Sequence, residues 1–367
     1  MQVLILGSRG IPANHGGFET FAEDLAHFLT SHGHHVTVYC QGEPGSQTYT
    51  DEWQGITLVH FPSSFGSLGT LEFDTYCALD AIKRTGLILT LGYNTAFLSI
   101  LYRITGRTSV MNMDGIEWKR DKWSKFSRLW LRANERAGEL LSDHLVADHP
   151  VIREHHLRHV NSKKITMIPY GATHSIIKWK SVPSLCEYKL DPFSYALVIA
   201  RVEPDNSILE IVQAFSDNKR GIPLVILGNF DRSKPYHASV LDAASHEVFF
   251  VGAIYDRDVV RMLRSYAKVY IHGHRVGGTN PSLVESLAAG NPVIAHDNPF
   301  TRWVAGDKAK FFGNREELSS IFDQIFSDDA ALAAMSQASL SRYSEDFIHD
   351  VVLQEYEDLL SHLSKQQ

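Results

Sequence analysis

Short apolar runs alternate with amphipathic segments along this chain, in two successive series. The first series predicts strands at residues 3–7, 35–40, 56–61, 87–91, 108–111, 144–147 and 165–168. Residues 18–31, between the first two strands, carry apolar side chains near helical spacing and predict a helix. Strands separated by helices are typical of a parallel sheet that is covered on both faces.

A second series follows residues 172–193, which are rich in Ser, Pro and Lys and have the composition of an interdomain linker. It predicts strands at 195–200, 223–227, 248–251, 267–271, 292–295 and 310–312, and helices at 208–215, 257–266, 282–289 and from about 318 onward. We therefore expect an α/β protein with two doubly wound, Rossmann-like domains, residues 1–171 and 172–345, facing a central cleft. Residues 346–367 are expected to form a C-terminal helix that packs back on the N-terminal domain.

Composition narrows the class of protein. Of the 367 residues, 44% are hydrophobic and 21% are charged, and no run of 18 apolar residues occurs, so we expect a globular chain without a membrane span. The net charge of −7 argues against nucleic acid as a partner. Three cysteines without metal or redox spacing, and no secretory signal, indicate the cytoplasm. The 19 histidines show no metal-site spacing, so no metal is expected.

The most informative stretch runs from His272 to Glu285, with a predicted strand, a glycine-rich loop and a helix that begins at Pro281. Backbone N–H groups at such a helix start bind anions. A carboxylate one turn further on, Glu285, can accept hydrogen bonds from the hydroxyls of a ribose. Diphosphate and ribose together indicate a nucleotide, and the expected donor-binding residues are Gly277, Gly278, Thr279, Asn280, Ser282, Leu283 and Glu285.

Two further candidates lie at predicted strand ends. Arg201 directly follows the strand at 195–200 and can stabilise the charge that develops on a leaving diphosphate without a metal. Its alternative role is that of a surface arginine paired with Glu203 or Asp205. Gly16 and Gly17 precede the first long helix, where a second helix N-terminus would face the same diphosphate.

Two carboxylates follow the strand at 108–111. Asp114 can orient an acceptor hydroxyl or stabilise positive charge at an anomeric carbon, and Glu117 is the second catalytic candidate. Asp-Gly is also a common turn dipeptide, so a structural role for Asp114 stays open. Asn14 and His15 are candidates for contacts with the acceptor or the sugar.

Four further segments carry a family resemblance: 7–21 (Gly-Ser-Arg-Gly-Ile-Pro-Ala-Asn-His-Gly-Gly-Phe-Glu-Thr-Phe), 113–120 (Met-Asp-Gly-Ile-Glu-Trp-Lys-Arg), 168–171 (Ile-Pro-Tyr-Gly) and 228–230 (Gly-Asn-Phe). In this order and spacing the chain resembles the retaining GT-B glycosyltransferases of family 4, and among them the bacterial rhamnosyltransferase-like branch. The resemblance implies a metal-independent hexosyltransferase with no cofactor, whose substrate is a dTDP- or UDP-sugar, with dTDP-rhamnose as the expected donor. It further implies transfer with retention to a glycan or polyprenyl-diphosphate-linked acceptor in polysaccharide synthesis.

The chain departs from the pattern of that family at two donor-site positions, and it also lacks the family's histidine in the N-terminal catalytic loop, where Asp114 is the nearest counterpart. The family has two glutamates eight positions apart at the donor site; Glu285 matches the second, but Gly277 stands at the first. The family also pairs an arginine with a lysine on the diphosphate; Arg201 matches the arginine, but Asn206 stands at the lysine position. Arg275 is included among the donor-binding residues because it, or Lys234, can supply the missing charge.

Residues 118–136 are predicted to form an amphipathic helix with an aromatic face (Trp123, Phe126 and Trp130) and a basic face (Lys125, Arg128, Arg132 and Arg136). A helix of this kind can lie on an anionic membrane, where a polyprenyl-linked acceptor would be found, so peripheral contact with the inner face of the plasma membrane is one expectation. The other is an ordinary helix whose aromatic face packs on the core while its basic face is solvated.

Three other functions remain open. A sugar-nucleotide 2-epimerase of the same architecture would consume the donor without an acceptor. A catalytically silent nucleotide-binding module would show no turnover. A dinucleotide-dependent oxidoreductase is disfavoured because the first loop, at residues 7–12, lacks the Gly-x-Gly-x-x-Gly fingerprint.

Overall fold

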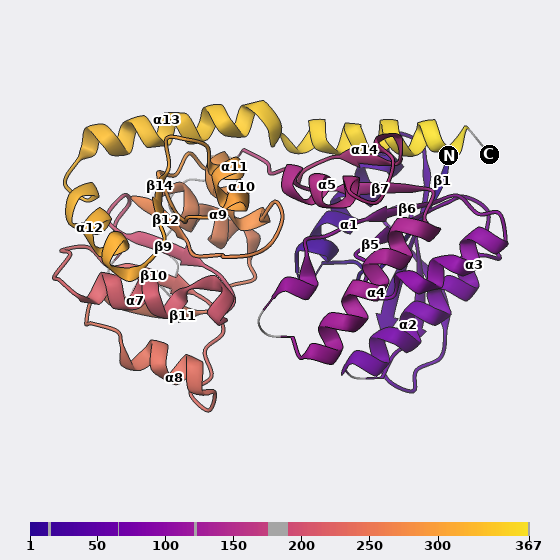
Figure 1. Cartoon of the computed structure of the whole chain (residues 1–367), viewed down its shortest axis with the longest axis horizontal. Helices are drawn as coiled ribbons and strands as arrows, with labels where there is room; N and C mark the ends of the chain where they lie inside the picture. The colour runs from indigo at the N-terminus through magenta and orange to yellow at the C-terminus, as the bar shows by residue number, and fades with distance from the viewer. Residues whose placement is uncertain (14–15, 65, 121–122, 175–189, 366–367) are drawn as a thin grey trace. The chain divides into compact units, whose positions relative to one another are not determined.

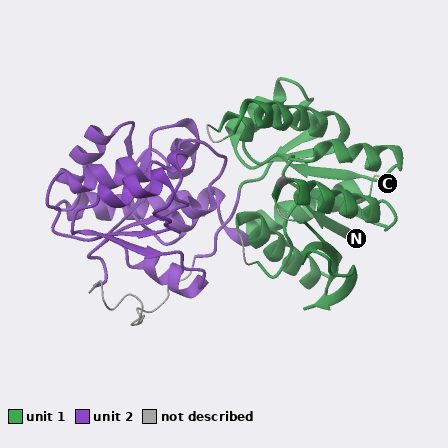
Figure 2. Cartoon of the chain, turned by 90° about the horizontal axis from the view of Figure 1, so that it is seen from below, with its two compact units in different colours: residues 1–169, 351–367 green, residues 170–350 purple. Residues whose placement is uncertain are grey.

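The computed structural model of the chain describes residues 1–13, 16–64, 66–120, 123–174 and 190–365. The chain divides into two compact units: unit 1 consists of Met1–Pro169 and Val351–Gln367, and unit 2 of Tyr170–Asp350 (Figure 2). The boundaries predicted from the sequence were residues 171 and 345. The last segment of the chain, Val351–Gln367, is grouped with unit 1.

Unit 1 is built on an eight-stranded sheet with the order β3-β4-β2-β1-β5-β6-β7-β8. Its strands are β1 (Gln2–Leu6), β2 (His35–Gly42), β3 (Tyr49–Trp53), β4 (Ile56–Pro62), β5 (Leu87–Leu91), β6 (Ser109–Asn112), β7 (His144–Ala147) and β8 (Ile165–Met167). Of these strands, Figure 1 labels β1, β5, β6 and β7. All neighbouring strands are parallel except β3 and β4. The carboxyl ends of β1, β5, β6 and β7 therefore lie next to one another on one edge of the sheet.

Strand β3 was not predicted from the sequence. It is an edge strand that is largely exposed, so it has no apolar run. A tight turn joins it to β4, and both turn residues, Gln54 and Gly55, have positive φ values of 51° and 80°.

The helices of unit 1 are α1 (Gly17–Ser31), α2 (Gly66–Ala81), α3 (Ser99–Ile104), α4 (Lys125–Leu141), α5 (Pro150–Leu157) and α14 (His349–Ser364), with short 3-10 turns η1 (Ala96–Leu98), η2 (Glu117–Lys119) and η3 (Ser162–Lys164). Ser124 caps α4 by accepting a hydrogen bond from the Ser127 N–H, and Pro150 begins α5, as expected for good helix starts. Within the described ranges, no helix is long and apolar enough to cross a membrane.

Helix α14 packs on unit 1. The ring of Tyr356 lies 4.9 Å from that of Phe21 on α1, and its hydroxyl accepts a hydrogen bond from the buried Asn112 amide at 2.9 Å. The next residue of α14, Glu357, binds the imidazoles of His32 and His34, each at 2.7 Å. The end of the chain thereby contributes to the core and the surface of unit 1.

Unit 2 contains a six-stranded parallel sheet with the order β11-β10-β9-β12-β13-β14. Its strands are β9 (Ala196–Ile199), β10 (Leu224–Leu227), β11 (Val248–Gly252), β12 (Val269–His272), β13 (Val293–His296) and β14 (Lys310–Phe312). Its helices are α7 (Ile208–Ser216), α8 (Pro235–Asp242), α9 (Arg257–Ser265), α10 (Pro281–Ala288), α11 (Pro299–Ala305), α12 (Arg315–Ile325) and α13 (Asp329–Asp346), with the 3-10 turn η4 (Pro204–Asn206).

Both faces of the unit 2 sheet are covered. In β9, Leu197 belongs to one buried cluster, whereas Ala196 and Val198 belong to another. Burial on both faces explains why these strands are continuous apolar runs in the sequence. The expectation of an α/β protein with two Rossmann-like parallel sheets is confirmed.

Candidate active site

The loops that follow β9, β10 and β12 approach one another closely at the carboxyl edge of the unit 2 sheet. A Cβ atom on Gly273 would lie 2.2 Å from the carbonyl oxygen of Asn206, and one on Gly228 would lie 2.7 Å from that of Ala200. Only glycine fits at either position without a shift of the backbone. The glycine-rich sequences therefore bring three strand-end loops together where α/β sheets bind ligands.

The start of α10 is capped from within the chain. The side chain of Asn280 accepts a hydrogen bond from the Ser282 N–H at 3.0 Å, and its carbonyl accepts one from the Leu283 N–H at 3.0 Å. Both of these predicted donor N–H groups thus have protein partners, and the Leu283 side chain is buried. Gly277, with φ of 149°, Gly278 and the buried Thr279 form the loop ahead of this cap.

Glu285 is paired with an arginine that sequence analysis did not identify. Arg264, near the end of α9, lies 2.6 Å from the Glu285 carboxylate and donates to the Ser282 hydroxyl at 2.9 Å. The side chain of Arg264 is 6% exposed and that of Glu285 is 42% exposed. The Ser282 hydroxyl also hydrogen-bonds the Tyr270 hydroxyl at 2.8 Å, so this side chain is part of a network within unit 2.

The predicted phosphate-binding cations differ in their surroundings. The Arg201 side chain is 67% exposed, and its nearest carboxylate is that of Glu203 at 3.7 Å, so the surface pairing considered from the sequence is present. Arg275 is bound instead to Glu210 at 2.6 Å and to the Ser207 hydroxyl at 2.8 Å. Of the two arginines, Arg201 is the more exposed, since the Arg275 side chain is 44% exposed and bound to Glu210.

Asn206, at the position where a lysine was expected, is buried in the loop after β9. Its amide donates to the Arg201 carbonyl at 2.8 Å. It thus fixes the backbone that carries Arg201 instead of adding a charge.

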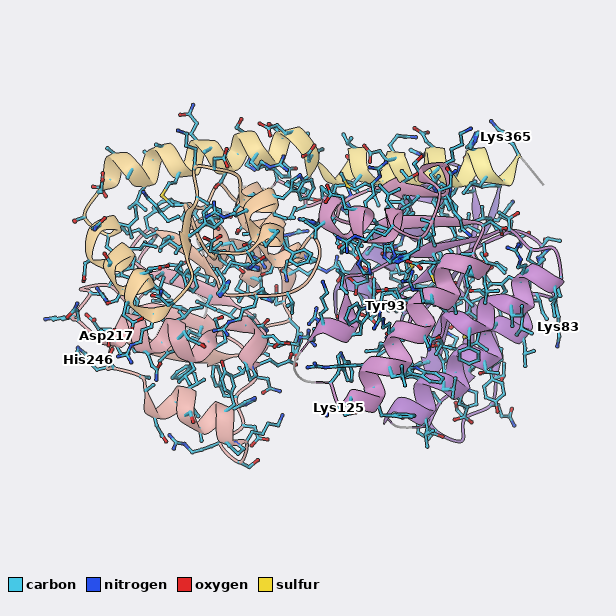
Figure 3. The ribbon with its side chains drawn as sticks, in the orientation of Figure 1. Lys83, Tyr93, Lys125, Asp217, His246 and Lys365 are labelled. Carbon is cyan, nitrogen blue, oxygen red and sulfur yellow. The ribbon has the colours of Figure 1, made fainter. Side chains whose placement is uncertain are left out.

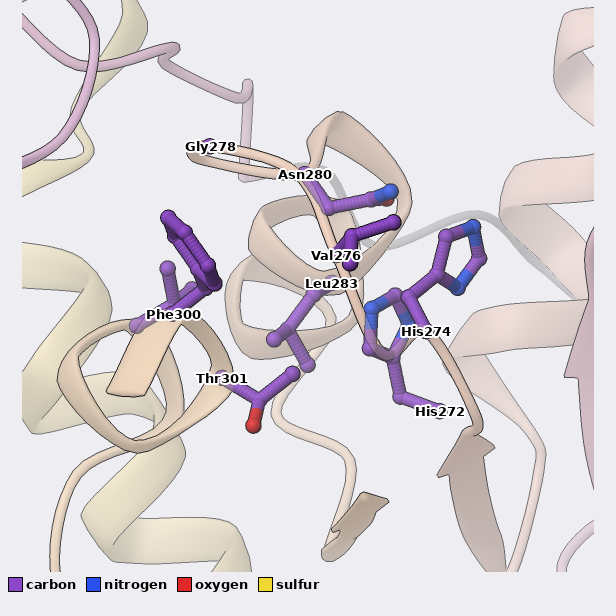
Figure 4. Close-up of a pocket in the computed structure, with 9 residues that line it drawn as sticks. His272, His274, Val276, Gly278, Asn280, Leu283, Phe300 and Thr301 are labelled. Atoms are coloured by element: carbon purple, nitrogen blue, oxygen red, sulfur yellow. The ribbon is translucent and has the colours of Figure 1, made fainter. Parts of the chain in front are cut away.

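A pocket opens beside the start of α10 (Figure 4). It is lined by His272, His274, Val276, Gly278, Asn280, Leu283, Phe300, Thr301 and Val304. The rings of His272 and His274 are stacked, with centroids 4.3 Å apart and an interplanar angle of 9°. Burial lowers the pKa of His272 well below its usual value, and the neighbouring His274 and His296 lower it further, so this imidazole is neutral.

In unit 1, the start of α1 already carries a carboxylate. Gly16 is the N-cap residue, and Glu19 in the first turn is 8% exposed and accepts a hydrogen bond from the Arg9 N–H at 3.0 Å. A carboxylate at this place satisfies the positive end of the helix dipole and opposes a bound anion. The start of α1 thus has a carboxylate in its first turn but no side-chain cap at Gly16, and anion binding at Gly16 and Gly17 stays a prediction.

The two residues predicted to contact the acceptor, Asn14 and His15, lie outside the described residues.

The loop after β6 carries Asp114 and Glu117. Tyr93, labelled in Figure 3, holds this loop: its hydroxyl donates to the Gly115 carbonyl at 3.2 Å and accepts from the Glu117 N–H at 2.8 Å. The Glu117 carboxylate binds the Arg120 guanidinium at 2.6 Å and accepts from the Trp123 indole at 3.3 Å. Asp114 and Glu117 are both partly exposed, and their catalytic roles stay predictions.

The predicted helix over residues 118–136 is corrected in two respects. Trp118 lies in η2, and α4 starts only at Lys125, the residue labelled at its lower end in Figure 3. Helix α4 also turns an apolar stripe outward: Phe126 is 77% exposed and Leu129 67% exposed, and Trp130, Ala133 and Leu140 are also exposed. The buried side of α4 carries Leu131, Asn134, Glu135, Gly138 and Glu139. The aromatic face therefore does not pack on the core.

Comparisons with known proteins agree with this architecture. Residues 1–173 match a family described as a domain of unknown function (DUF1972), and residues 189–342 match glycosyl transferases group 1. A search of curated proteins finds no match.

Several solved structures share the fold across both chains. Sucrose-phosphate synthase from Thermosynechococcus elongatus is 16% identical with a TM-score of 0.80, and covers 100% of each chain. HepE from Anabaena in complex with UDP is 15% identical with a TM-score of 0.75, covering 99% of this chain and 100% of its own. A glycosyltransferase from Rickettsia africae is 14% identical with a TM-score of 0.73, covering 100% and 99%. The chain has the GT-B fold, and its second half carries a glycosyl transferase group 1 domain, so it is a glycosyltransferase.

Proposed function

We propose that this protein transfers a sugar, L-rhamnose from dTDP-rhamnose, to a lipid-linked glycan at the inner face of the plasma membrane. The proposed binding of the sugar-nucleotide donor rests on the pairing of Glu285 with buried Arg264. This pair lies beside the glycine loop and the capped start of α10. The guanidinium fixes one oxygen of a half-exposed carboxylate, and the rest of that group can accept hydrogen bonds from ribose hydroxyls. The similarly folded HepE was solved in complex with UDP, which supports a nucleotide as the ligand of this chain.

The proposed transfer proceeds on the front face of the sugar, with retention. The bond from the anomeric carbon to the leaving phosphate oxygen breaks, the acceptor oxygen bonds to that carbon, and the leaving phosphate oxygen takes the acceptor proton. Arg201 stabilises the charge gained by the diphosphate, because its exposed guanidinium lies on the loop after β9. Asp114 orients the acceptor hydroxyl, whereas Glu117, bound to Arg120, positions the loop.

A nucleotide panel tests the donor. The melting temperature would be measured with dTDP, UDP, GDP and NAD, with Mg²⁺ and with EDTA. A ligand at a hundredfold excess over its Kd stabilises the folded chain by about 2.7 kcal/mol. A shift with dTDP or UDP that EDTA leaves unchanged supports the proposal, and a shift with NAD alone would refute it. Consumption of the sugar nucleotide without an acceptor would instead indicate an epimerase.

The membrane part of the proposal rests on the outward stripe of α4. Phe97 of η1 packs against Trp130 with ring centroids 5.7 Å apart, and the exposed Ile100 and Ile104 of α3 extend the apolar surface. Exposed Lys125, Arg132 and Arg103 adjoin it on the same two helices. Apolar side chains bordered by cations match the interface of an anionic bilayer, which is where a polyprenyl-linked acceptor would be found.

Vesicle binding tests this surface. Phe126→Ser with Leu129→Ser should reduce co-sedimentation with anionic vesicles more than tenfold, because each side chain would lose about 1.5–3 kcal/mol of burial in the bilayer. The melting temperature should stay unchanged, since both side chains are exposed in the folded chain. Tyr255→Ser, at a residue of unit 2 that is 76% exposed, is the matched control. Equal binding by the double variant and this control would refute the membrane contact.

A further inference from the structure

His272 has a buried polar side chain that forms no hydrogen bond with the described residues. It ends β12, it is 1% exposed, and neither of its ring nitrogens has a hydrogen-bond partner among the described residues. Stacking against His274 holds the ring in place, and the ring lines the pocket beside α10 (Figure 4). Buried polar groups are nearly always paired, and leaving one unpaired destabilises a fold.

The lining of the pocket indicates which chemical group can hydrogen-bond to His272. A neutral imidazole presents one N–H donor and one lone-pair acceptor, and a hydroxyl group is complementary to both. The opposite wall is apolar, formed by Leu283, Phe300 and Val304, and suits the C–H face of a sugar ring. An anion fits less well, because this lining contains no lysine or arginine and His272 stays neutral.

We propose that His272 forms hydrogen bonds with a hydroxyl group of the transferred sugar and so determines donor specificity. The stacked ring of His274 positions the His272 ring. The inference rests on the proposed function, because the glycine loop Gly277–Gly278 beside the pocket is where the diphosphate is expected. The stability that the unpaired imidazole costs the free protein is recovered when the sugar hydroxyl enters the pocket.

The test variant is His272→Leu, which removes both nitrogens at similar volume. Because it deletes an unpaired buried group, it should melt at or above the wild-type temperature. It should bind dTDP and UDP as the wild type does, yet bind dTDP-rhamnose or UDP-glucose about tenfold more weakly, in proportion to one lost hydrogen-bonded pair. His237→Leu is the matched control: the ring of His237 is buried in the same unit but accepts a hydrogen bond from the Asp231 N–H at 3.0 Å, so its loss should lower the melting temperature.

Three outcomes would overturn the inference. Unchanged affinity of the His272→Leu variant for the sugar nucleotides would mean that the imidazole binds only a water molecule. A lower melting temperature would mean that the ring has a structural partner. Weaker binding of dTDP or UDP alone would move its role to the nucleotide. If the wild-type protein bound none of these compounds, the proposed function would fail, and this inference with it.

Discussion

Replacing Glu285 by alanine should destabilise unit 2 as well as impair donor binding, because the substitution leaves Arg264 without its carboxylate. The Arg264 side chain is only 6% exposed, so water cannot replace the lost partner. Breaking a buried pair in this way costs about 3–5 kcal/mol, and the partial exposure of Glu285 favours the lower end, about 3 kcal/mol. In a domain of 150–250 residues this corresponds to a melting temperature lower by about 6–12 °C.

Two companion variants isolate the cause. Arg264→Met leaves a carboxylate that is 42% exposed and can be hydrated, so it should cost less, about 1–2 kcal/mol for the lost hydrogen bonds. The double variant removes both charges and should lie within about 1 kcal/mol of the wild type. It should therefore be more stable than Glu285→Ala alone, a non-additivity that differential scanning calorimetry can measure.

The reasoning is refuted if Glu285→Ala melts at the wild-type temperature, or if the losses of the two single variants simply add in the double variant. Should the predicted pattern appear, donor affinity would have to be measured in the double variant, where the loss of the carboxylate is not confounded with a destabilised fold.

Three other substitutions have defined outcomes. Gly273→Ala would place a methyl group 2.2 Å from the Asn206 carbonyl oxygen and should cost about 2–3 kcal/mol in urea unfolding; a cost below about 0.5 kcal/mol would show that the loop yields easily. Burial raises the pKa of Asp74 to about 6, so the wild type loses stability as pH rises from about 4 to 6. Asp74→Asn should therefore be more stable at pH 8 by about 2–3 kcal/mol and lose that advantage near pH 4; a pH-independent difference would contradict the assignment. Tyr356→Phe removes the acceptor of the buried Asn112 amide and should cost about 1–2 kcal/mol, measured by thermal unfolding; no change would mean that the amide finds another partner.

The strands were predictable because a strand buried on both faces of the sheet is a continuous apolar run in the sequence. The strand predicted at 87–91 coincides with β5, and that at 144–147 with β7. Strand β3 was not predicted, because an exposed edge strand needs no apolar residues. Helices α8 and α11 were also missed, since each has fewer than nine residues and so gives a weak periodicity.

The local structure of the candidate site was predictable where residues close in sequence form it, and not where distant elements pack together. The loop from Gly277 to the cap at Asn280 is local, so its glycines and its helix start could be recognised. The partner of Glu285 is on another helix, and nothing near Arg264 in the sequence marks it. Periodicity likewise showed that α4 has an apolar and a polar face but could not show which face the protein buries.

The return of α14 to unit 1 orders events during synthesis. A ribosome completes all of unit 2, Tyr170–Asp350, before it makes Tyr356 and Leu360, which are buried residues of α14. Unit 2 is one continuous segment and can fold as it emerges. The earlier residues of unit 1 cannot complete their packing until α14 is made, because Phe21 and Asn112 lack their partner, Tyr356. The half of the enzyme that is translated first is thus the half that matures last.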